Sequence, residues 1–127
     1  MHRIALLACL AIAGCGESPS PEPAGTDAVR RSARAYVEAL RSQQWGRACG
    51  LMTAAAREEL RDGSEGSCPH ALAAGAALAP AELDAIRRQL AGARVRVRGG
   101  RATLGPLGDG ELSLGLERRR ARWLVAG

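Results

Sequence analysis

The clearest structural pattern in this chain lies in Ala93-Arg94-Val95-Arg96-Val97-Arg98-Gly99-Gly100-Arg101-Ala102-Thr103-Leu104. Small apolar and basic residues alternate up to the glycine pair, which is the period of a β-strand with one buried face. Gly99-Gly100 is a strong signal for a two-residue hairpin turn. Ala102 and Leu104 continue the alternation on the return strand. The pattern therefore predicts an antiparallel hairpin.

The predicted sheet continues to the end of the chain. The return strand is expected to end at Gly105-Pro106, because a proline removes a donor from the hydrogen-bond ladder. A third alternating run begins at Leu112, a turn is expected over 118–121, and Arg122-Trp123-Leu124-Val125 forms a last strand. The positions expected to face inward are all apolar: Val95, Val97, Ala102, Leu104, Leu112, Leu114, Leu116, Trp123 and Val125.

Helical periodicity precedes this sheet. Thr26 or Asp27 offers an N-cap, and apolar residues then recur at helical spacing, which predicts a helix over 28–42. Further helical segments are expected over 45–52, over 54–60, over 68–74 and from Pro80 onward. Because helices come before an antiparallel meander, the fold class is α+β.

The N-terminal segment has a different composition. An apolar run over 4–14 is too short to cross about 30 Å of hydrocarbon, but it suits a secretory signal. Its end, Ile12-Ala13-Gly14-Cys15, resembles a bacterial lipobox, where a signal peptidase cuts before a cysteine that carries acyl chains. The expected organisation is a lipoprotein signal peptide at 1–14, the lipidated Cys15 with a Pro/Ser/Glu tether at 15–26, and a domain at 27–127. The resemblance implies a lipid anchor at the extracytoplasmic face of the cell membrane.

Two cysteines, Cys49 and Cys68, remain in the expected domain. Outside the reducing cytoplasm they are expected to form a disulfide, which would close a loop of about 20 residues and stabilise the domain by roughly 3 kcal/mol. The alternative is a metal site or a reactive thiol. Only His70 lies nearby, and two sulfurs with one histidine do not complete a structural tetrahedral site. We therefore predict the disulfide and no metal.

The chain carries a net charge of +5, and all 18 of its basic side chains besides histidine are arginines. One interpretation is a solvated basic surface. The other is attraction toward anionic lipid headgroups, at roughly 1 kcal/mol per basic residue near the surface. Nucleic acid is not expected as a partner of a chain that is exported from the cytoplasm.

Several segments then occur in an order that resembles one group of proteins. They are the tethered lipobox, Tyr36-Val37-Glu38-Ala39-Leu40, Trp45-Gly46-Arg47-Ala48-Cys49, Leu51-Met52-Thr53, Cys68 and Arg122-Trp123-Leu124-Val125. Together they resemble small secreted lipoproteins of high-GC Gram-positive bacteria whose domain is similar to the nuclear transport factor 2-like superfamily. The resemblance implies a curved antiparallel sheet that wraps around helices as a cone with an apolar pocket. Tyr36, Trp45 and Trp123 would be candidate pocket-lining residues, or ordinary core aromatics.

The residues form no recognisable catalytic set. Enzymes similar to this superfamily, such as ketosteroid isomerase and SnoaL-like polyketide cyclases, place an Asp base or an Asp/His pair inside the cone. Here Asp109 and Glu111 lie at a glycine-rich turn, Glu117 is on the polar side of its strand, and His70 is expected in a loop. We expect a non-enzymatic domain without a cofactor, which binds a small apolar ligand in the cone or a protein partner on the sheet. A SnoaL-like isomerase or cyclase is the alternative.

Overall fold

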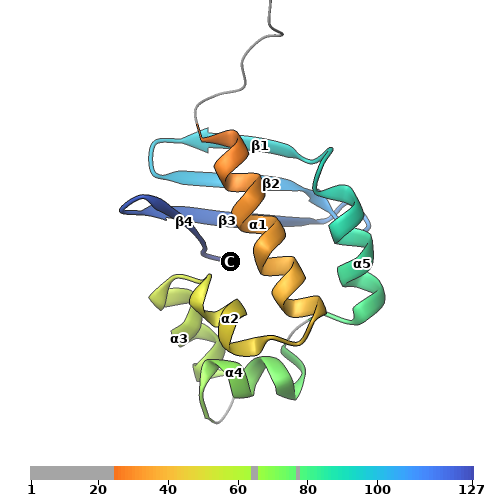
Figure 1. Ribbon diagram of the computed structural model, residues 1–127, viewed down its shortest axis with the longest axis vertical. Coiled ribbons are helices and arrows are strands. Elements are labelled where there is room, and N and C mark those ends of the chain that lie inside the picture. Colours follow the sequence, from red (N-terminus) through yellow and green to blue (C-terminus); the bar gives the residue numbers. More distant parts are fainter. Residues whose placement is uncertain (1–24, 64–65, 77) are drawn as a thin grey trace, which may run out of the picture.

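The computed structural model describes residues 25–63, 66–76 and 78–127. The predicted signal peptide, Cys15 and most of the tether lie outside the described residues. The helical elements are α1 (Thr26–Arg41), α2 (Trp45–Gly50), α3 (Ala54–Asp62), α4 (Cys68–Ala71), the short η1 (Leu72–Ala76) and α5 (Pro80–Gln89). The strands are β1 (Arg94–Arg98), β2 (Arg101–Leu107), β3 (Leu112–Arg119) and β4 (Arg122–Val125). The α+β prediction is confirmed: helices come first, and a four-stranded antiparallel sheet follows (Figure 1).

The sheet is an open meander with strand order β1-β2-β3-β4 and is not closed or strongly curled. The predicted glycine turn joins β1 to β2, so that Arg98 lies opposite Arg101 and Val95 opposite Leu104. Leu104 in turn pairs with Leu114 on β3. This register places the apolar side chains of the strands on one face and most of the basic ones on the other.

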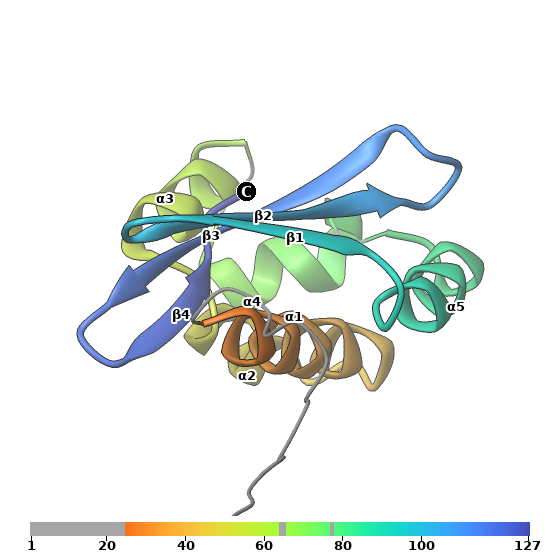
Figure 2. The same ribbon diagram turned by 90° about the horizontal axis from the view of Figure 1, so that it is seen from above.

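Helix α1 lies across the apolar face of the sheet, as Figure 2 shows from above. Its apolar residues recur at three- and four-residue spacing, so they form one stripe on the helix. Val29, Ala33, Val37 and Leu40 are all buried. They pack into one core with Leu104, Leu116, Trp123 and Val125 of the sheet and with Leu83 and Ile86 of α5.

The side chain of Arg30 on α1 binds the loop between α5 and β1. Arg30 Nη1 donates hydrogen bonds to the carbonyl oxygens of Leu90 (2.9 Å), Ala91 (3.1 Å) and Ala93 (2.7 Å). The last carbonyls of a helix have no partner within it. The guanidinium therefore satisfies carbonyls at the end of α5 and fixes the start of β1.

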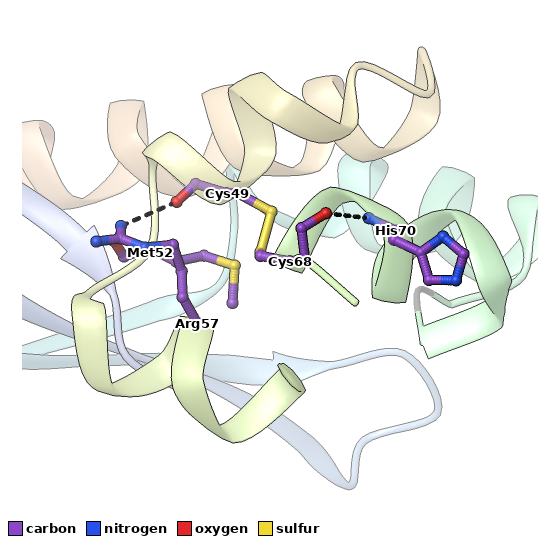
Figure 3. The surroundings of a disulfide bond; sticks show 6 residues. Cys49, Met52, Arg57, Cys68 and His70 are labelled. Carbon is purple, nitrogen blue, oxygen red and sulfur yellow. Dashed lines mark hydrogen bonds between the residues drawn. A yellow bond between two sulfur atoms is a disulfide. The ribbon is translucent and has the colours of Figure 1, made fainter. Parts of the chain in front are cut away.

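The predicted disulfide is present between Cys49 at the end of α2 and Cys68 at the start of α4 (Figure 3). Arg57 on α3 donates to the carbonyl oxygens of Cys49 (3.2 Å) and Met52 (2.7 Å), which ties α3 to the same corner. Thr53 caps the start of α3, since its Oγ1 accepts a hydrogen bond from the Ala56 amide. These bonds join three short helices that have little apolar surface of their own.

The same corner is joined to the edge of the sheet. The Thr53 amide donates to the Val125 carbonyl, and the Val125 amide donates to the Leu51 carbonyl, each at 2.8 Å. Met52 and Val125 form an isolated parallel bridge there. Strand β4 is therefore covered at its free edge by the segment between α2 and α3.

Two details of the predicted sheet are wrong. Strand β2 does not end at Gly105-Pro106 but continues to Leu107. The register shifts between Leu104 and Leu107, so the proline falls in a bulge, where no ladder donor is needed. The alternation predicts Leu112 at an inward position, but its side chain is 40% exposed, because it opens β3 beside the turn.

The first helix also differs from its prediction. It begins at Thr26 and ends at Arg41, rather than spanning 28–42. Its N-cap is Gly25, with a φ of 92° and no side-chain cap, instead of Thr26 or Asp27. Thr26 is buried as the first residue of the helix, one position after the N-cap.

Candidate functional site: the cavity between helix α1 and the sheet

A cavity of about 110 Å³ lies between α1, α5 and the strands β2 and β3. Helix α1 contributes Tyr36, Val37 and Leu40 to its wall. The rest of its wall is formed by Leu78, Leu83, Ile86, Leu107, Leu112, Ser113 and Leu114. Most of this lining is apolar, so the cavity suits an apolar ligand better than a charged one.

Local sequence patterns explain why these side chains meet. Val37 and Leu40 belong to the buried stripe of α1, and Leu83 and Ile86 are one helical turn apart on α5. Leu107 is buried where β2 pairs with β3 again after the bulge. The cavity therefore lies where two amphipathic helices and the irregular part of the sheet meet.

Tyr36 lies between this cavity and a neighbouring groove of about 250 Å³. The groove runs along α3 and the C-terminal end of the chain, and it shares Leu114 with the cavity. Burial removes water from the phenol, and this desolvation raises the pKa of Tyr36 above its usual value. The phenol is therefore neutral at physiological pH and can donate a hydrogen bond to a ligand.

Trp45 lines a different hollow, of about 390 Å³, at the corner of α1, α2 and α5. This hollow is larger but open, and Arg41 and Asp84 lie at its wall as an ion pair at 2.7 Å. It shares Leu40, Leu78 and Leu83 with the smaller cavity. The structure therefore places Tyr36 and Trp45 on either side of the same apolar wall.

Trp123 lies elsewhere, and none of the hollows above includes it in its wall. It is 6% exposed and belongs to the core at the N-terminal end of α1. A Cβ on Gly25 would lie 3.5 Å from its ring, an ordinary van der Waals distance, so it is the φ of 92° and not the indole that favours glycine there. The three candidate aromatic residues are thus at three separate places.

The acidic and imidazole groups considered from the sequence lie outside the cavity. His70 is exposed on α4, where its amide donates to Ser67 Oγ (Figure 3). Asp109 and Glu111 are exposed at the β2–β3 turn, and Glu117 pairs with Arg119 on the outer face of the sheet. Within the described ranges, His, Cys, Asp and Glu side chains form no group of three or more that could hold a metal ion. No helix in this part of the chain is both long and apolar enough to span a membrane.

Sequence reasoning missed part of the wall. Leu107 lies beyond the proline at which the sequence predicts the end of the strand, and Leu78 lies in a connection that shows no periodicity. An alternating apolar residue beyond Pro106 was the only available signal for Leu107.

No family model, curated protein or solved structure matches this chain. The assignment of a function therefore rests on the geometry of the domain and on the sequence patterns alone.

Proposed function

We propose that this chain is a membrane-anchored lipoprotein whose extracytoplasmic domain is a non-catalytic binding module for a small apolar ligand. The observation that carries the proposal is the apolar cavity between α1 and the sheet, with the neutral phenol of Tyr36 in its wall. The lipobox-like motif at Ile12-Ala13-Gly14-Cys15 supports the anchor.

The size of the cavity limits the ligand. Dry apolar cavities of about 150 Å³ bind single-ring compounds such as benzene, and this cavity measures about 110 Å³. The ligand is therefore expected to have no more than about six non-hydrogen atoms. A longer ligand would have to pass Tyr36 into the neighbouring groove, where its polar end could meet water.

The proposal also concerns the fold family of the domain. We take the domain to be a small, shallow relative of the nuclear transport factor 2-like cone. The support is the element order, with helices first and a meander last, and the position of α1 across the apolar side of the sheet. Because this sheet is open, the space left under α1 is smaller than a full cone would enclose.

Benzene is a suitable probe for this proposal. Titration into the ¹⁵N-labelled chain from residue 15 onward, with Cys15→Ser to remove the lipid site, should shift the amide signals of Tyr36, Ile86 and Leu114. Leu114→Phe fills the cavity and should abolish these shifts. Leu124→Phe adds the same bulk on the outer face of the sheet and should leave them in place. Shifts that scatter over the surface, or that persist in Leu114→Phe, would show that the cavity is not the site.

A ligand from the host can be sought in parallel. Native mass spectrometry of the domain purified from its host should show an added mass that Leu114→Phe loses and Leu124→Phe keeps. An added mass that both variants keep would place the ligand elsewhere.

A further inference from the structure

The outer face of the sheet carries a concentrated positive charge. Alternation along the strands places Arg94, Arg96, Arg98, Arg101, Arg119 and Arg122 at outward positions, together with one acid, Glu117. The excess of five positive charges on this face equals the net charge of the whole chain, +5. We call these six arginines the basic face.

Fewer arginines are paired with carboxylates on the basic face than on the helical side of the domain. On the helices, Glu38 and Asp84 lie among the basic residues and form ion pairs with Arg41 and Arg87. On the sheet, Glu117 pairs with Arg119 at 2.8 Å. Among the described residues, no carboxylate lies within ion-pair distance of the other five arginines of the basic face. Their charge is therefore available to a partner.

The register brings like charges together. Arg98 lies directly opposite Arg101, and Arg119 lies directly opposite Arg122. Like charges directly opposite on neighbouring strands destabilise a sheet. Glu117, which lies opposite Arg101 and pairs with Arg119, is a single carboxylate among these four arginines and offsets only part of this cost. Arginines on an edge strand can discourage pairing with another chain, but that role does not explain Arg101 and Arg119 on the inner strands.

A shallow hollow of about 540 Å³ lies within the basic face. Arg94 and Arg96 border it, and Thr103, Gly105 and Ser113 form part of its floor. A Cβ on Gly105 would come within 3.0 Å of Ser113, so the strands approach closely there and the floor stays low. The hollow can admit a tetrahedral oxyanion between two guanidinium groups, which bind phosphate in a bidentate manner.

The composition of the face indicates which partner it fits. Leu124 is the one large apolar side chain at an outward position of the four strands, and none of these positions is aromatic. Protein interfaces derive most of their affinity from aromatic and arginine anchors around an apolar core. An open sheet face with charge and no apolar centre instead suits a surface of many phosphate groups.

We propose that the basic face docks onto the anionic phospholipid headgroups of a membrane, with a headgroup phosphate in the hollow between Arg94 and Arg96. The choice of a membrane as the source of phosphate rests on the proposed lipid anchor, since the Pro-rich part of the expected tether, residues 17–25, is only about 30 Å long when extended. The docking would hold the sheet against the bilayer and leave α1 and the apolar cavity facing away from it.

The test uses the unlipidated chain from residue 15 onward with Cys15→Ser, which contains every residue of the described core. Its sedimentation is measured with vesicles of phosphatidylcholine alone and with vesicles that contain roughly one phosphatidylglycerol in three lipids. We expect binding to the anionic vesicles only. The binding should be lost at about 1 M salt, where the Debye length falls to about 3 Å.

Two triple variants with the same net charge localise the contact. The sheet variant, Arg96→Gln, Arg101→Gln and Arg122→Gln, should bind about a hundredfold more weakly, since each basic residue near the surface contributes about fivefold. The helix variant, Arg31→Gln, Arg34→Gln and Arg88→Gln, removes exposed charges from the other side and should change binding by less than about threefold. Circular dichroism checks that both variants are folded.

Three outcomes would overturn the proposal. They are no binding to anionic vesicles, an equal loss in the two triple variants, and tighter binding to a short DNA duplex than to the vesicles, which would indicate nucleic acid as the partner. Because this chain carries no lipid, these outcomes are independent of whether Cys15 is acylated in cells.

Discussion

The side-chain amide of Gln89 pairs with the backbone of Gly108 in both directions. Gln89 Nε2 donates to the Gly108 carbonyl oxygen at 2.8 Å, and Gln89 Oε1 accepts from the Gly108 amide at 2.6 Å. The pair joins the last turn of α5 to the β2–β3 turn, where the ladder is irregular. One side chain thus replaces a strand partner and holds the wall of the cavity in place.

Replacement of Gln89 by alanine should therefore destabilise the domain. Loss of both hydrogen bonds, with the Gly108 groups half-buried, is expected to cost about 2 kcal/mol in the free energy of unfolding. Urea denaturation measures the loss, and hydrogen exchange of the Gly108 amide should become faster. Arg88→Ala, at the exposed neighbouring position, is the control. Equal stabilities of the two variants would show that the pair contributes nothing.

The disulfide should contribute more than any single hydrogen bond. Cys49→Ala with Cys68→Ala removes the link between α2 and α4, which spans 19 positions of the chain. The free energy of unfolding should fall by about 3 kcal/mol. The matched control is Cys15→Ser, which removes a cysteine outside the described domain and should leave the stability unchanged. Addition of a reductant to the unmodified chain should reproduce the loss, whereas alkylation of both thiols without reduction would contradict the bond.

Ionisation of Tyr36 should lower the free energy of unfolding at alkaline pH. Its pKa is raised in the folded domain because burial disfavours the phenolate, so the folded state holds the proton more tightly than the unfolded chain. The free energy of unfolding should be level below about pH 10 and should fall as the pH rises above it. The chain has one tyrosine and no lysine, so few other groups titrate in this range. Urea denaturation of Tyr36→Phe should show no such fall; an equal slope in that variant would assign the effect to another group.

Much of the architecture could be predicted from periodicity. The alternation from Ala93 to Val97 and the Gly99-Gly100 turn both lie where the sequence indicates them. These features depend on local conformational preferences, which neighbouring residues set directly. The bulge at Pro106 does not depend on local preferences alone. Beyond it, β2 pairs with β3 again, and Gln89 contacts Gly108 at the following turn.

The cavity was harder to predict than the fold. The sequence singles out the aromatic residues, but whether two of them share a cavity depends on how α1, α2 and the sheet pack. Tyr36 and Trp45 face different hollows although they are nine positions apart, and Trp123 lies in the core. The sequence indicates outward arginines by alternation only for β1. That Arg119 lies opposite Arg122 follows from the register of β3 and β4, which periodicity does not give.

The central claim is that this chain is anchored to a membrane through Cys15, and fractionation of cells that express the unmodified chain or Cys15→Ser tests it most directly. The unmodified chain should be in the membrane fraction, should resist extraction by high salt, and should carry an acyl mass at Cys15. The Cys15→Ser chain should be released, or remain as an uncleaved precursor without the acyl mass. A variant that still matures and stays acylated at the membrane would contradict the account.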